Sequence, residues 1–199
     1  MHISEGVLTV PVLALGWGTA AAGIGFGLKK TSPENLHKTA LVSGVLFLVS
    51  LVHVPLGPSS IHLTCLGLAG MLLGWSAVPA LFVALVLQGV LFQFGGLLSL
   101  GVNTAIMGTA ALTGYGIWRC GSGKVPYLFA FAGGFFAILI GSVLVTLTLA
   151  LSNQDLILTA GVIFAANLPL AGVEGLISVF ILSFLAKMLP DYVPRPAGI

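Results

Sequence analysis

Apolar segments long enough to cross a lipid bilayer as helices follow one another along almost the whole chain. One crossing needs about 17–25 predominantly apolar residues. Seven segments fit this pattern, with approximate boundaries 7–28, 37–54, 60–74, 77–94, 102–118, 126–151 and 156–187. The third is short, and the last is long enough to be tilted or interrupted near Asn167-Leu168-Pro169. We therefore predict an all-α membrane protein with seven transmembrane helices.

The composition excludes a soluble globular protein. Hydrophobic residues make up 58% of the chain and charged residues only 6%, whereas soluble proteins keep many charged residues for their surface. The polar breaks between the apolar segments are short, so we expect residues 1–199 to form a single integral-membrane domain. We expect no cleaved signal sequence, because the basic region that begins one is missing.

The basic residues predict the orientation in the membrane. With seven spans and the N-terminus outside, every lysine and arginine falls on the cytoplasmic side, as the positive-inside rule requires. These residues are Lys29, Lys30, Lys38, Arg119, Lys124, Lys187 and Arg195. A different number of spans would scatter them over both faces. The predicted topology is therefore N-terminus outside and C-terminus cytoplasmic.

The first two residues, Met1 and His2, can chelate a metal ion. The free α-amino group, the following amide nitrogen and Nδ1 of a histidine at position two close two fused chelate rings. These three nitrogens fit a square-planar site, the geometry suited to Ni(II) or Cu(II). We expect Met1 to be retained, because histidine is too large for easy removal of the initiator methionine. The alternative is a histidine without function in a frayed terminus.

Two further histidines share the predicted outer face with His2, namely His53 and His62, whereas His37 lies on the cytoplasmic side. Taken singly, each is more often an interfacial histidine than a ligand, but their convergence favours a metal site. His62 is the preferred fourth nitrogen, because a turn-rich connection, residues 55–60, precedes it and can hold one imidazole in place. His53 is the competing ligand, or a group that orients one.

Other polar residues in apolar surroundings are candidates for supporting roles. Asn103 is a plausible hydrogen-bond donor to a metal ligand, and Glu5 could anchor the N-terminal segment or balance the charge of the ion. Glu174 lies well inside the last span, where a carboxylate is expensive unless it is paired. We expect it to form a structural hydrogen bond, to Asn167 or Gln88; the alternative is a role in the metal path or in coupling.

Several function classes lack their motifs. The sequence contains no GxxxxGK[ST] loop, so it binds no nucleotide by that device, and neither HExxH nor GxSxG occurs. Nucleic-acid binding has no support, since the few basic residues are explained by topology. The competing interpretation is an intramembrane zinc-dependent metalloenzyme with His2, His53 and His62 as ligands and Glu5 as general base. A purely structural membrane subunit is a third.

Four stretches of the chain resemble one known family. They are Met1–Gly6, His53–His62, Gly95–Asn103 and Leu168–Gly175. They are similar to the CbiM/NikM family, the substrate-binding S components of energy-coupling factor (ECF) transporters for cobalt and nickel. The resemblance covers nearly the whole chain, and its N-terminal motif is highly specific.

This resemblance implies a bundle of six core helices with an additional N-terminal span, in the cytoplasmic (inner) membrane of a prokaryotic cell. It also implies metal coordination by the Met1 amine, the His2 amide and imidazole, and His62. The implied partners are a transmembrane coupling protein (the T component), a pair of cytoplasmic ATPases and often a small accessory membrane subunit. The chain would then be no enzyme itself, but the nickel or cobalt uptake subunit of an ABC-type transporter, in the context of cobalamin biosynthesis. The amide chelate tilts the choice of metal slightly toward nickel.

Overall fold

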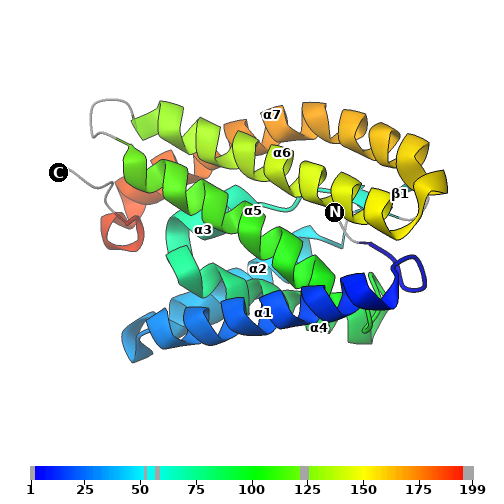
Figure 1. Cartoon of the computed structure of the whole chain (residues 1–199). Helices are drawn as coiled ribbons and strands as arrows, with labels where there is room; N and C mark the ends of the chain where they lie inside the picture. Colours follow the sequence, from blue (N-terminus) through cyan, green and yellow to red (C-terminus); the bar gives the residue numbers. More distant parts are fainter. Residues whose placement is uncertain (1–2, 52, 57–58, 122–125, 195–199) are drawn as a thin grey trace.

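The chain folds into a bundle of helices with one small β-hairpin (Figure 1). The computed structural model describes residues 3–51, 53–56, 59–121 and 126–194. The helices in these ranges are α1 (Val10–Lys30), α2 (Leu36–Val49), α3 (Leu66–Leu73), α4 (Ala77–Phe92), α5 (Leu100–Cys120), α6 (Pro126–Ser152) and α7 (Ile157–Met188). Short 3-10 turns lie at Pro33–Asn35, Gly74–Ser76, Gln154–Leu156 and Pro190–Tyr192. The hairpin strands are β1 (His53–Leu56) and β2 (Ser59–His62).

Four helical segments of the described chain are long and apolar enough to cross a membrane, which makes this a multi-pass membrane protein. They are Val10–Lys30, Leu66–Phe92, Pro126–Ser152 and Ile157–Met188. The predicted helical fold is confirmed at this level. The last helix is continuous through Pro169, so of the two alternatives for the last span, tilt or interruption near residues 167–169, the interruption does not occur.

The prediction for residues 50–65 was wrong. Helix α2 ends at Val49, and the chain then forms an antiparallel hairpin in which His53 pairs with His62. Pro55 lies in this hairpin, and a proline has no N–H to donate to a helix. Helix α3 begins only at residue 66, after Cys65 with a left-handed φ of 51°, and is 8 residues long. Apolar length alone did not distinguish a buried extended segment from a helix.

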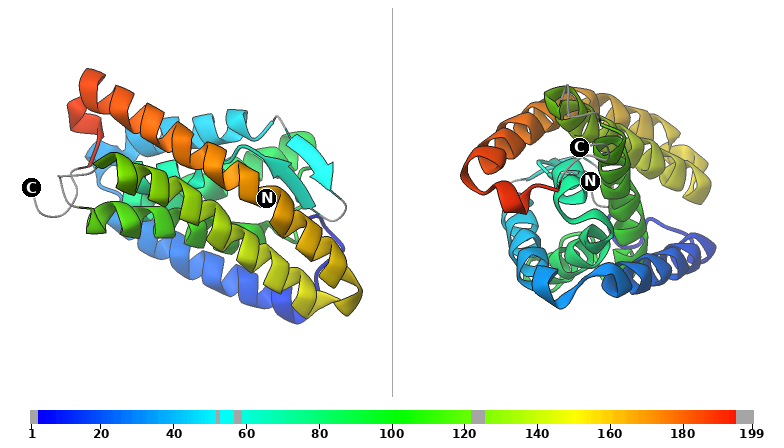
Figure 2. Two further views of the ribbon diagram at one scale, coloured as in Figure 1. Left: turned by 90° about the horizontal axis from the view of Figure 1, so that it is seen from above. Right: turned by 90° about the vertical axis from the view of Figure 1, so that its left-hand side faces the viewer.

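Helix α3 forms the centre of the bundle, inside a ring of longer helices (Figure 2). Its residues from Leu66 to Met71 are all buried. Two glycines allow this close packing: a Cβ at Gly70 would overlap the carbonyl oxygen of Ala111 in α5, and a Cβ at Gly67 would overlap that of Gly133 in α6. The segment that follows His62 is therefore enclosed by packed helices on several sides.

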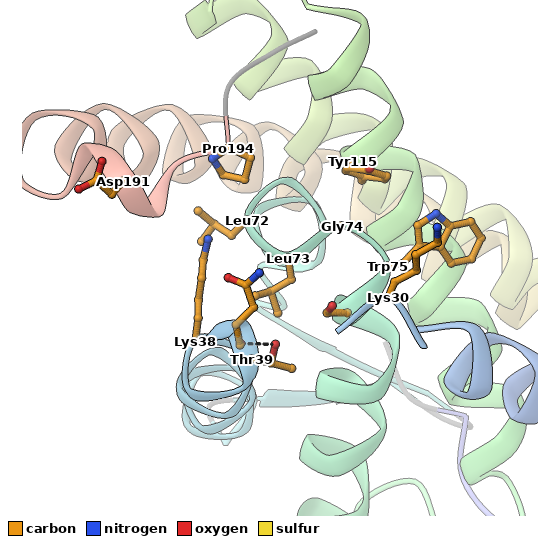
Figure 3. Close-up of a pocket in the computed structure, with 12 residues that line it drawn as sticks. Lys30, Lys38, Thr39, Leu72, Leu73, Gly74, Trp75, Tyr115, Asp191 and Pro194 are labelled. Atoms are coloured by element: carbon orange, nitrogen blue, oxygen red, sulfur yellow. Dashed lines mark hydrogen bonds between the residues drawn. The ribbon is translucent and has the colours of Figure 1, made fainter. Parts of the chain in front are cut away.

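The two ends of the bundle differ in their chemistry. The start of α1, the hairpin and the connection from α6 to α7 lie at one end, and the chain emerges from α7 at the other (Figure 1). A cavity of about 400 Å³ opens at this second end, and Lys30, Lys38, Tyr115 and Asp191 are among its lining residues (Figure 3). The Nζ of Lys38 donates to the carbonyl oxygen of Tyr192 at 2.6 Å. Basic side chains from α1 and α2 therefore line the same cavity as the C-terminal segment, and Lys38 contacts that segment directly.

Candidate metal centre

His62 is the candidate ligand that the structure describes most fully. It is the last residue of β2 and only 3% exposed. Its Nδ1 lies 2.9 Å from the carbonyl oxygen of Leu63. Because a carbonyl oxygen can only accept, this contact fits the neutral tautomer with the hydrogen on Nδ1, in which Nε2 has the lone pair. Histidines that bind metals usually have this arrangement, in which the second ring nitrogen donates to a carbonyl or carboxylate.

The residues that follow His62 are held by Glu174 of α7. Its Oε1 accepts three hydrogen bonds, from the amide of Thr64 at 2.5 Å, the hydroxyl of Thr64 at 2.9 Å and the amide of Cys65 at 2.9 Å. Glu174 itself is completely buried. Backbone and side-chain donors thus satisfy Oε1, whereas Oε2 is buried without a partner among the described residues.

The predicted partners of Glu174 were wrong. The amide nitrogen of Asn167 instead donates to the carbonyl oxygen of Ile163 in its own helix, at 2.9 Å. The side-chain oxygen of Gln88 has no hydrogen-bond partner among the described residues. Sequence reasoning missed Thr64 and Cys65, because two of the three donors are their backbone amides and only one, the Thr64 hydroxyl, is a side chain. The one available signal was the position of Thr64, a polar residue two places after His62 in an apolar run.

Asn103 of α5 forms two hydrogen bonds with the N-terminal segment. Its Oδ1 accepts from the amide of Ile3 at 2.8 Å, and its Nδ2 donates to the carbonyl oxygen of the same residue at 3.1 Å. Both residues are buried, and the side chain of Ile3 is fully enclosed. Ile3 and Cys65 belong to one continuous cluster of buried residues. The backbone next to His2 is therefore fixed inside the protein.

Glu5 makes a second attachment of the same segment. Its Oε1 accepts from the amide of Leu98 at 3.0 Å. The loop that carries Leu98 turns at Gly96, where φ is +84° and a Cβ would lie 2.5 Å from that of Glu5. Only glycine fits both demands. This contact accords with the anchoring alternative for Glu5.

The remaining predicted ligands fall largely outside the described residues. Met1 and His2 lie outside them, and for His53 the structure gives only the backbone pairing with His62. Within the described ranges, no three His, Cys, Asp or Glu side chains are grouped so that they could hold a metal ion. A site around His62 therefore requires further ligands from outside the described residues.

Comparison with known proteins decides the family. The model of the family described as CbiM, cobalt uptake substrate-specific transmembrane region, matches residues 2–192. The chain belongs to the CbiM family. The resemblance of its sequence motifs to this family is thereby confirmed, and the comparisons give no support to a zinc-dependent metalloenzyme.

The relatives of this CbiM-family chain are transport proteins. A protein of Haemophilus influenzae, provisionally named a metal transport protein, is 34% identical over 98% of both chains. The cobalt transport protein CbiM of Lachnoclostridium phytofermentans is 32% identical, over 92% of this chain and 80% of its own length. A solved structure of a transition metal transporter superposes with a TM-score of 0.84 at 26% identity, covering 94% of this chain and 93% of the other.

Proposed function

We propose that this chain is the substrate-binding subunit of an ECF-type transporter and captures a nickel or cobalt ion at the outer face of the membrane. The family match and the transporter-like fold support metal transport. The main support for the site is the pair of hydrogen bonds between Asn103 and Ile3, because it holds the backbone next to His2 in the interior. The same cluster of buried residues contains Cys65, three residues after His62.

The proposed ligands are the α-amine of Met1, the amide and imidazole of His2, and Nε2 of His62. Four nitrogens of this kind form a square plane, which suits Ni(II). Binding through a deprotonated amide favours Ni(II) over Co(II), although cellular supply of the two metals can override this preference. His53 and Glu5 are the proposed supporting residues, since His53 pairs with His62 along the hairpin and Glu5 ties the N-terminal segment to Leu98.

The proposed topology has seven crossings, with the N-terminus outside. Strand β2 and helix α3 together would make the third crossing. Extended backbone at membrane depth is tolerated where protein encloses it, and Glu174 satisfies the amides of Thr64 and Cys65 there. The gathering of Lys30 and Lys38 at the opposite end of the bundle supports a cytoplasmic assignment for that end (Figure 3).

Transport would require partners that supply energy. The chain has no nucleotide-binding loop, so ATP hydrolysis would occur in a pair of cytoplasmic ATPases. A transmembrane coupling protein would pass the resulting motion to this bundle, and a small accessory membrane subunit could complete the complex. Purification of the tagged chain from its native cells, followed by mass spectrometry of the associated proteins, tests this assembly.

Titration of the purified protein with Ni(II) and Co(II) tests the site. Intact-mass measurement first establishes whether Met1 is its terminal residue. We expect tight one-to-one binding that is lost when one residue is added before Met1, and that weakens by more than about tenfold in His62→Ala. His37→Ala is the matched control, because His37 is exposed and lies in α2, near the opposite end of the bundle. Binding that survives both the extension and His62→Ala would refute the proposed ligand set.

A further inference from the structure

Glu174 is connected to His62 through a single peptide group. The carbonyl oxygen of Leu63 and the amide of Thr64 belong to the same planar unit. That carbonyl oxygen lies 2.9 Å from Nδ1 of His62, and that amide donates to Glu174 at 2.5 Å. The direction of the amide fixes the direction of the carbonyl, and the carbonyl fixes the rotation of the imidazole ring. We propose that Glu174 is the positioning residue that aims Nε2 of His62 at the transported ion.

This inference rests on the proposed function, since it assumes that His62 is a ligand. Glu174 is not itself proposed as a ligand. Its role would be exerted across two hydrogen bonds and one peptide plane, and its carboxylate comes from α7, 110 residues along the chain from Thr64. Outer residues that orient a metal-binding histidine typically change metal affinity by about 10–100-fold when they are lost.

The backbone at Cys65 is independent evidence that this segment is held in place. Its φ of 51° is in the left-handed region, which a residue with a Cβ rarely adopts. Such a conformation persists only where the surroundings over-determine it, and such residues cluster at functional sites. The amide of Cys65 donates to Glu174 at 2.9 Å. The strained residue and the residue before it thus share one acceptor oxygen.

Glu174 is well placed to act as a fixed support. It lies in the middle of α7, where α6 packs closely against it: a Cβ on Gly134 would lie 2.7 Å from the carbonyl oxygen of Glu174. Both its backbone and its side chain are buried, so the carboxylate has little freedom to follow movements of the segment. A support on a packed helix holds a ligand more accurately than one on a loop.

Two substitutions separate positioning from a charge effect. Glu174→Gln keeps the length of the side chain and an acceptor oxygen but removes the charge. Glu174→Asp keeps the charge but withdraws the carboxylate by one methylene from Thr64 and Cys65. Positioning predicts Ni(II) affinity within about threefold of native for Gln and a loss of about 10–100-fold for Asp. The reverse order would overturn the proposal in favour of charge compensation.

A double-mutant cycle with His62→Ala shows whether Glu174 acts through the imidazole. If it does, Glu174→Asp weakens binding in the native background but not in the His62→Ala background. Additive losses would overturn the proposal. The His62→Ala single variant also distinguishes the two levels of inference: if it binds like the native protein, the proposed function itself fails, and this inference fails with it.

The Ni(II) absorption spectrum reports the ligands directly. Replacement of one nitrogen by water should shift the ligand-field bands of Glu174→Asp toward those of His62→Ala, a change that general destabilisation would not cause. Ser178→Ala is the matched control, because Ser178 lies one turn along α7, is fully buried, and its hydroxyl lacks a partner among the described residues. It should leave affinity and spectrum unchanged. Should Glu174→Asp fail to fold, Glu174→Leu removes the acceptor altogether and carries the same prediction.

Discussion

The contribution of the two hydrogen bonds between Asn103 and Ile3 can be tested with Asn103→Leu, which keeps the shape of the side chain and removes both of them. Each hydrogen bond of this kind contributes about 0.5–1.5 kcal/mol net, and a buried backbone group left without a partner costs about 1–3 kcal/mol. Ile3 would lose a partner for its amide and for its carbonyl oxygen. Docking of the N-terminal segment should therefore weaken by about 2–4 kcal/mol.

This loss of docking free energy lowers the metal affinity if only the docked N-terminal segment binds the ion. Since about 1.4 kcal/mol corresponds to a factor of ten, the dissociation constant should rise by about 30-fold to several hundred-fold. This change in the dissociation constant is an upper bound. If the docked state is much more stable than the undocked state, it stays mostly populated after part of that stability is lost. Burial of the Ile3 side chain, worth about 1.5–3 kcal/mol, continues to favour docking.

Two measurements check this prediction. Calorimetric titration gives the Ni(II) affinity, and hydrogen exchange at Ile3 reports docking without metal. Asn167→Leu is the matched control, because Asn167 is equally buried but bonds only within its own helix. A folded Asn103→Leu protein with native affinity and native protection at Ile3 would refute the reasoning.

Three further predictions concern pH, packing and topology. Protons compete with the ion for the imidazole nitrogen, whose ordinary pKa is about 6.5. Metal affinity measured by titration should therefore fall steadily as the pH is lowered below that value. A flat dependence of affinity on pH would contradict histidine ligation. Gly70→Ala should destabilise the protein by about 1–3 kcal/mol in thermal or denaturant unfolding, because the new Cβ overlaps the carbonyl oxygen of Ala111, whereas Gly18→Ala, with nothing within 4 Å, should be neutral or stabilising. Cys120 is exposed at the end of α5, whereas Cys65 is buried. A membrane-impermeant thiol reagent should therefore label Cys120 only after intact cells are permeabilised, and should leave Cys65 unlabelled throughout. Labelling of Cys120 in intact cells would reverse the proposed orientation.

The long helices followed directly from local sequence. The predicted spans 126–151 and 156–187 correspond to α6 (Pro126–Ser152) and α7 (Ile157–Met188) within a residue or so at each end. A helix forms its backbone hydrogen bonds within one segment, so few other backbone conformations are open to a long apolar segment in lipid. The region from residue 50 to residue 65 can be non-helical, because its backbone forms hydrogen bonds within the hairpin and with Glu174 of α7.

By itself, the sequence determined the membrane class, most of the helices and the identity of the candidate ligands, since hydrophobic length and residue chemistry are local properties. Only the tertiary structure decided which groups meet. Asn103 reaches Ile3 across 100 residues, and Glu174 reaches Thr64 across 110. Such contacts depend on how packed helices are rotated and shifted against one another, and glycines such as Gly67 and Gly70 set that packing through steric contacts between distant segments. Two of the three donors to Glu174 are backbone amides, which every residue except proline carries, so side-chain identity could not reveal them.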